Sequence, residues 1–232
     1  MPSPKPLLPE GAEAGLFFYD GQYQFVTRSG RRDQVKFLGP QAVRAAFTSE
    51  RLDSGWIRPE IVRSGSVATG PFAVAFLTAR TREITVAPPG EEPFVLTVPV
   101  PPIVAIGSGA GLSLFAVREN TFDPNAKVHY APFPNLFADA RVCWGANAAP
   151  PVDHTAIVAA VDLYFSSPFN LNEAARRSLA YPANVVEQLR RLARRRARSY
   201  PVDDLVRVPN TGSVGAIVDR IISSRHGGQE WD

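Results

Sequence analysis

The chain has 232 residues, of which 45% are hydrophobic, 20% charged and 10% aromatic. This composition supplies a substantial buried core and excludes disorder, a collagen-like repeat and a coiled coil as descriptions of the whole chain. Cys143 is the single cysteine, which excludes an intramolecular disulfide. We therefore expect the protein to be located in a reducing cytoplasm. With one cysteine and three scattered histidines, we expect no metal site and no cofactor. No run approaches the roughly 20 apolar residues that cross a bilayer, so no membrane partner is expected.

The formal net charge of +3 is unevenly distributed. Between Arg176 and Arg198, eight arginines stand against the single acid Glu187, a local balance of +7 that leaves −4 for the rest. Such arginines can form an ordinary solvated face, dock on an acidic protein surface or bind nucleic-acid phosphates. A protein partner is favoured over nucleic acid, because few nearby aromatic residues are available to stack bases. The candidate partner-binding residues are Arg190, Arg191, Arg194 and Arg195.

The first fifty residues predict a flexible, proline-rich segment over residues 1–14, followed by strands. Between Leu16 and Thr27, the dipeptide Asp20-Gly21 separates two aromatic, β-prone runs, a pattern typical of a tight hairpin. We therefore expect two strands to open the fold. Apolar residues at helical spacing predict a short helix over residues 41–50.

The middle of the chain predicts an antiparallel meander. Proline or glycine clusters separate short apolar runs at hairpin-like intervals: Phe72–Thr78, Glu83–Ala87, Phe94–Val98, Ile103–Ile106 and Leu112–Val117. Proline lacks the N–H that a strand ladder requires, so Pro99, Pro101 and Pro102 predict an edge strand or a crossing loop. Residues 107–111 are glycine-rich and predict a hairpin, because no helix follows to bind a phosphate.

The last third predicts helices. Asp153-His154-Thr155 can cap a helix over Ala156–Phe165, which ends at Ser166-Ser167-Pro168. Asn184 can cap a second helix that reaches about Arg198. Apolar spacing predicts a third helix over Val214–Ser223. Strands followed by helices indicate the α+β class, with the helices on one face of the sheet.

The candidate chemistry lies in Pro132–Gly145, PFPNLFADARVCWG. If the chain reverses around Asp139, then Asn135 and Cys143 are equidistant from the turn and face each other. A thiol can hold an acyl group as a thioester, and an amide N–H can stabilise the oxyanion that forms when an amine attacks it. A buried, inert cysteine, an ordinary turn asparagine and a pairing of Cys143 with His129 remain alternatives.

These residues resemble a known active site. Phe133-Pro134-Asn135, with Cys143 eight positions after the asparagine, resembles the His-Pro-Asn motif and catalytic cysteine of ubiquitin-conjugating enzymes. The text Pro-Asn-Leu followed by Val-Cys-Trp-Gly is similar to the prokaryotic ubiquitin-conjugating-enzyme-like family D, the group that includes protein B of the PRTRC system. The resemblance implies an antiparallel β-meander with flanking helices over residues 15–200, plus a C-terminal helical extension over 201–232.

The resemblance also implies an activity. A bacterial conjugating enzyme would accept a ubiquitin-like protein from an activating enzyme as a thioester on Cys143 and pass it to an amine. Asn135 would stabilise the oxyanion or organise the loop. Asn170 or Asn172 would stand where the family often has an acid, although an amide is no base. The implied active-site loop residues are Pro134, Asp139, Trp144, Asn170 and Asn172.

The implied partners are a ubiquitin-like protein, an activating enzyme and a deconjugating metalloprotease of the same system. Two other functions remain open. One is a catalytically inactive scaffold of the same fold that binds a ubiquitin-like protein or the activating enzyme. The other is a nucleic-acid-binding module that uses the arginine-rich helix.

Overall fold

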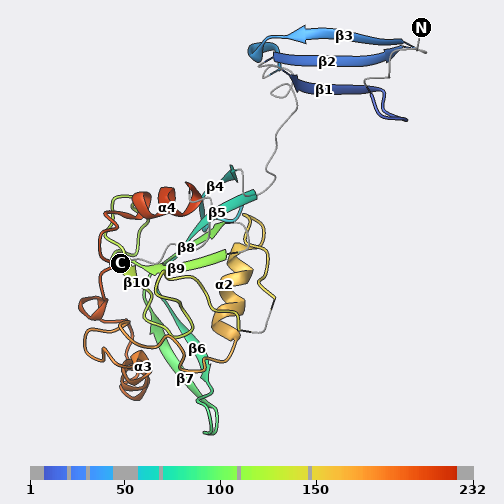
Figure 1. Cartoon of the computed structure of the whole chain (residues 1–232). Coiled ribbons are helices and arrows are strands. Elements are labelled where there is room, and N and C mark those ends of the chain that lie inside the picture. The colour runs from blue at the N-terminus through green and yellow to red at the C-terminus, as the bar shows by residue number, and fades with distance from the viewer. Residues whose placement is uncertain are drawn as a thin grey trace. The chain divides into compact units, whose positions relative to one another are not determined.

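The structure is a computed structural model that describes residues 8–19, 22–29, 32–43, 57–67, 70–108, 111–145 and 148–223 (Figure 1). The chain forms two compact units, Met1–Trp56 and Ile57–Asp232. The division at residues 14 and 200 stays a prediction.

The first unit is an antiparallel sheet with the strand order β1-β2-β3. Its strands are β1 (Ala14–Tyr19), β2 (Gln22–Ser29) and β3 (Arg32–Leu38). Tyr19 pairs with Gln22, so the hairpin predicted around Asp20-Gly21 is confirmed, although those two residues lie outside the described ranges. Of the helix predicted over residues 41–50, residues 41–43 are helical and the rest lies outside the described ranges.

Residues before β1 contact this sheet. The Arg28 guanidinium donates hydrogen bonds to the carbonyl oxygens of Leu8 at 2.8 Å and Pro9 at 3.1 Å. Leu8 and Val26 are buried. The small core of the first unit therefore includes part of the segment that precedes its strands.

The second unit is built on a five-stranded antiparallel sheet with the order β10-β9-β8-β5-β4. Its strands are β4 (Ile61–Val67), β5 (Gly70–Leu77), β8 (Ile103–Ser108), β9 (Gly111–Ala116) and β10 (His129–Tyr130). A second pair consists of β6 (Arg80–Val86) and β7 (Phe94–Val100). Leu77 pairs with Ile103, and Arg80 pairs with Val100, so β5–β6 and β7–β8 form one long interrupted hairpin. The predicted meander is confirmed.

Prolines interrupt this long hairpin. Pro101 and Pro102 connect β7 to β8 and have no N–H to donate to the opposite strand. On that opposite side, the Ala79 N–H donates instead to Asn120 Oδ1 at 2.6 Å. Pro99 lies in the two-stranded β6–β7 sheet, where both strands are edges. The prediction of an edge or crossing segment at these prolines is confirmed.

Helices cover both faces of the five-stranded sheet (Figure 1). Helix α2 (Ile157–Ser166) packs on the face formed by Ala73, Ala75 and Leu77. Helix α4 (Val214–Ser223) packs on the opposite face, formed by Phe72, Val74 and Phe76. The prediction that the helices share one face is wrong, because the continuous apolar runs of β5, β8 and β9 need cover on both sides.

Side-chain hydrogen bonds of nearby residues explain where α2 and α3 begin. Asp153 Oδ1 accepts hydrogen bonds from the Thr155 and Ala156 N–H groups in the turn that leads into α2. Asn184 Oδ1 accepts from the Val186 N–H at 3.0 Å and caps α3 (Val185–Arg194). The predicted starts are confirmed, and α4 has the predicted bounds. Helix α3, which packs on β7, ends at Arg194 rather than near residue 198.

Gly107 permits the close approach of the segment before α2 to β8. A Cβ atom at this position would lie 2.4 Å from the Val152 carbonyl oxygen. We expect Gly107→Ala to destabilise the protein by about 1–3 kcal/mol, because backbone must move to relieve the overlap. Urea unfolding measures this change.

Gly111→Ala is the matched control. At Gly111 the nearest atom to an added Cβ is the Ser108 carbonyl oxygen at 3.5 Å, an ordinary contact. We expect the free energy of unfolding to stay within about 0.5 kcal/mol of the wild type. Equal stabilities for the two variants would contradict the tight packing at Gly107.

Candidate active site

The chain reverses at residues 137–140, as the sequence predicts. The Ala140 N–H donates to the Phe137 carbonyl oxygen at 2.8 Å, which closes the turn. The residues on either side of the turn form two arms, the asparagine arm (residues 132–136) and the cysteine arm (residues 141–145). Between them, the Cys143 N–H donates to the Asn135 carbonyl oxygen at 2.9 Å. The predicted opposition of Asn135 and Cys143 is confirmed for the backbone, whereas a contact between their side chains stays a prediction.

The cysteine arm is fixed to the edge of β9. The Leu114 N–H donates to the Ala140 carbonyl oxygen at 3.0 Å, and the Val142 N–H donates to that of Leu112 at 2.7 Å. Cys143 follows directly, as a half-buried free thiol. The next side chain, Trp144, packs against the main core. The thiol therefore follows a segment that is hydrogen-bonded to the sheet.

Asn135 joins the cysteine arm to the loop after α2. Its N–H donates to the Asn172 carbonyl oxygen at 2.8 Å, and its side-chain Oδ1 accepts from the Asn170 N–H at 3.4 Å. Asn170 Oδ1 in turn accepts from the Asn172 N–H at 3.0 Å. Within the described ranges, the Asn135 Nδ2 group makes no hydrogen bond, so its two N–H donors are available to a ligand.

The loop that holds Asn170 is attached to β6. The Phe169 N–H donates to the Thr85 carbonyl oxygen at 2.9 Å, and the Ala87 N–H donates to that of Phe169 at 2.7 Å. Phe169 is fully buried. These contacts fix the loop segment that contacts Asn135 to the folded core.

An aromatic cluster supports the segment around Pro134. Phe133 is fully buried, with its ring centroid 5.0 Å from that of Phe165 in an edge-to-face arrangement. The Tyr164 hydroxyl donates to the Pro134 carbonyl oxygen at 2.7 Å. Burial raises the pKa of Tyr164 well above its usual range, so the hydroxyl keeps its proton for this bond. Phe133 therefore replaces the motif histidine with apolar packing.

Arg177 is a site residue that sequence reasoning missed. Its Nη2 donates to the carbonyl oxygens of Leu136 at 2.6 Å and Phe137 at 2.5 Å, and its guanidinium lies over the Tyr130 ring at 4.6 Å. Only 3% of Arg177 is exposed, and this burial lowers its pKa. Its assignment to a basic surface patch is wrong. No sequence signal distinguishes Arg177 from the neighbouring arginines. In contrast, Tyr164 lies within an apolar helix, so a hydrogen-bond partner for its hydroxyl could have been expected.

Backbone strain is concentrated around these residues. Seven non-glycine residues of the described ranges have positive φ angles. Such conformations cost free energy and often mark functional sites. Five of the seven lie in the turn and its two arms or in the loop after α2: Asn135, Ala140, Leu171, Glu173 and Arg176.

Other predicted site residues lie elsewhere. Asp139 is at the tip of the turn, at the far end of the arm from Cys143, and its carboxylate accepts from Arg141 Nε at 2.5 Å. Arg190 is on α3, where it pairs with Glu187 at 3.2 Å and lies over the Phe94 ring at 4.3 Å. The remaining predicted arginines, also on α3 or at its end, are Arg191, Arg194 and Arg195.

The alternative pairing of Cys143 with His129 is wrong. His129 pairs with Ala116, whereas Val142, next to Cys143, is bonded to Leu112. These two positions of β9 are about 13 Å apart at the usual rise of a strand. Burial lowers the pKa of His129, so it is neutral at pH 7. Within the described ranges, no three histidine, cysteine or acidic side chains gather as metal ligands.

The sequence matches prokaryotic E2 family D over residues 35–208, more than half of the chain. The chain belongs to prokaryotic E2 family D. Membership of family D connects the protein with ubiquitin-like conjugation and, in general, with ubiquitin-like proteins and activating enzymes. The α+β fold with antiparallel sheets agrees with this family. Comparison with curated proteins and with solved structures gives no match.

The match to family D includes both arms of the turn, the loop after α2 and helix α3, and it ends before α4.

Across the described part of the chain, no helix has the length and apolar character needed to cross a membrane.

Proposed function

We propose that this family D protein carries a ubiquitin-like protein as a thioester on Cys143 and transfers it to an amine. The observation that carries the proposal is the 2.9 Å backbone hydrogen bond between Cys143 and Asn135. It supports the proposal because the backbones of the two residues that resemble the family motif are adjacent, and because the segment before Cys143 is bonded to β9.

The reaction has two acyl transfers. In the first, the Cys143 thiolate attacks the C-terminal carbonyl carbon of the ubiquitin-like protein on the activating enzyme. A new C–S bond forms and the thiolate of the activating enzyme leaves. In the second, the nitrogen of an amine attacks the same carbon, the C–S bond breaks, and Cys143 leaves as the thiolate while the amine loses a proton to water.

Asn135 supports the second transfer. Negative charge develops on the carbonyl oxygen as the amine attacks, and an N–H donor held in place stabilises that charge. The Asn170 N–H anchors Asn135 Oδ1, which directs Nδ2 as the free donor. Arg177 holds two carbonyl oxygens of the same arm. These contacts position the donor before the reaction begins.

An inactive scaffold is the second candidate. It is favoured by the resemblance to the family, which implies that Asn170 or Asn172 stands where an acid is often found, and an amide cannot accept a proton from the attacking amine. Such a scaffold would bind a ubiquitin-like protein or its activating enzyme without forming a bond to it.

One reaction separates the two candidates. The protein is incubated with the activating enzyme, the ubiquitin-like protein and ATP, then given free lysine, and samples are run on a non-reducing gel. Carrier activity predicts a reductant-sensitive adduct that disappears as the lysine product forms. If the activating enzyme is charged and no adduct forms, the scaffold is the correct description.

A further inference from the structure

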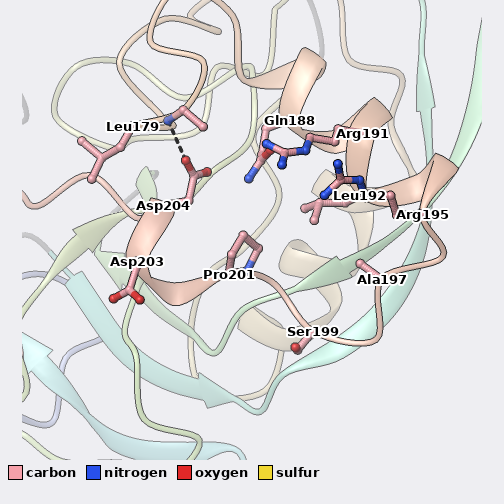
Figure 2. A pocket seen from close by; sticks show the side chains of 11 residues that line it. Leu179, Gln188, Arg191, Leu192, Arg195, Ala197, Ser199, Pro201, Asp203 and Asp204 are labelled. Carbon is pink, nitrogen blue, oxygen red and sulfur yellow. Dashed lines mark hydrogen bonds between the residues drawn. The ribbon is translucent and has the colours of Figure 1, made fainter.

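A pocket of about 630 Å³ lies beside helix α3 in the second unit (Figure 2). Its walls come from α3, from residues 179–180 and from the segment 197–204 that follows the helix. This volume is within the range of about 300–1,000 Å³ that is common for ligand pockets. None of its lining residues belongs to the arms that hold Asn135 and Cys143.

Two free cations lie on the α3 side of the pocket. Arg191 and Arg195 are four residues apart, so they occupy neighbouring positions on one helix face (Figure 2). Both are exposed, and in the described part of the chain neither guanidinium has an ion pair or a hydrogen bond. Like charges at this spacing repel each other, so a bound anion would stabilise the pair.

A buried acceptor in the same pocket also lacks a partner. Gln188 lines the pocket and is only 3% exposed, and its Oε1 atom has no hydrogen-bond donor among the described residues. A buried acceptor without a donor is costly, and such groups are rare in folded proteins. The Oε1 atom is closed off from the pocket space, so a ligand N–H reaches it only when the Gln188 side chain turns toward the pocket.

The acids of the pocket are already occupied. Asp203 pairs with Arg118 at 3.2 Å. The carboxylate of Asp204 accepts hydrogen bonds from three donors within the fold: Ser178 Oγ, Ala180 N and Tyr200 Oη. The arginines thus remain as the charges that a ligand can neutralise.

We propose that this pocket binds an acidic peptide segment of a protein partner. A carboxylate of the peptide lies between Arg191 and Arg195, and the Gln188 side chain turns toward the pocket so that its Oε1 accepts from a backbone N–H of the peptide. An apolar side chain of the peptide packs on the aliphatic wall, formed by Leu179, Leu192 and Pro201. The carboxylate belongs either to an Asp or Glu side chain or to the chain terminus.

The pocket fits a peptide better than a nucleic acid. A phosphodiester backbone offers acceptors and no N–H donor for Gln188. No aromatic residue lines the pocket, so bases have no surface on which to stack.

Fluorescence polarisation tests the proposal with defined probes. The probes are labelled hexapeptide libraries with two fixed Glu positions and mixed apolar residues elsewhere, and a matched library with Gln in place of Glu. We expect saturable binding of the Glu library and at least tenfold weaker binding of the Gln library. Amidated and free C-termini distinguish a side-chain carboxylate from the chain terminus. Failure of both forms of the Glu library to bind overturns the proposal.

Matched variants locate the binding. The double substitution Arg191→Gln and Arg195→Gln should weaken binding at least tenfold. Arg196→Gln with Arg198→Gln removes the same charge from exposed positions outside the pocket and should change binding less than threefold. Equal losses in the two double variants, or tighter binding of an oligothymidine, overturn the proposal.

Gln188→Met tests the unpartnered acceptor. Loss of one neutral hydrogen bond predicts roughly threefold to tenfold weaker binding of the Glu library. Circular dichroism checks that this variant is folded, and unchanged affinity in a folded variant overturns the role of Gln188. Cys143→Ala should bind the library as the wild type does, so this result is independent of the proposed thioester chemistry.

Discussion

Asn135→Ala is expected to form the Cys143 adduct normally and to transfer it to an amine about 100-fold to 1,000-fold more slowly, the usual cost of losing one oxyanion donor. Loading depends on the cysteine and on the activating enzyme, whereas transfer depends on the charge that develops at the carbonyl oxygen. Single-turnover discharge of the preloaded protein to free lysine measures the effect.

Asn135→Asp separates the two roles that the asparagine can have. The aspartate keeps an oxygen to accept from the Asn170 N–H, but it has no N–H to offer the carbonyl oxygen. Slow transfer in both variants supports the donor role. Restored transfer in Asn135→Asp would show that Asn135 only anchors the loop, and wild-type rates in both variants would remove it from the reaction.

Phe133→Ala is expected to lower the free energy of unfolding by about 3–5 kcal/mol, the usual cost of removing a buried aromatic ring. Phe133 is fully buried and contacts the rings of Phe165 and Phe169. The cavity would lie beside Phe165 and Phe169, in the aromatic cluster that supports Pro134. Urea unfolding measures the loss.

Leu163→Ala is the control on α2. Leu163 is 46% exposed, and alanine favours a helix, so we expect a change of less than about 1 kcal/mol. Phe133→His, which restores the motif residue, should also destabilise the fold, because an imidazole needs a hydrogen-bond partner in this apolar cluster. Wild-type stability in Phe133→His would contradict the packing role assigned to Phe133.

The central geometry of the site could be predicted from the sequence, because it depends on local spacing. Equal distances from Asp139 place Asn135 opposite Cys143 once the chain reverses, and residues 137–140 form that turn. The start of α3 was equally predictable, since Asn184 supplies its own capping oxygen.

Features that depend on distant parts of the chain could not be predicted in this way. Arg177 lies in a run that reads as a basic surface, and only the tertiary fold brings the Leu136 and Phe137 carbonyl oxygens to it. Strand β4 was missed because it is an edge strand whose residues are mostly exposed, so it carries little apolar pattern. The packing of helices on both faces of the sheet could not be predicted either, because it depends on the tertiary contact of α4 with Phe72 and Val74.

The kind of bond that forms at Cys143 decides whether the protein is a thioester carrier. Because Cys143 is the only cysteine in the chain, a thioester can form at no other residue. With a charged activating enzyme, we predict a reductant-sensitive adduct in the wild type, a reductant-resistant oxyester in Cys143→Ser and no adduct in Cys143→Ala. An adduct that persists in Cys143→Ala, or that resists reductant in the wild type, would contradict the thioester carrier.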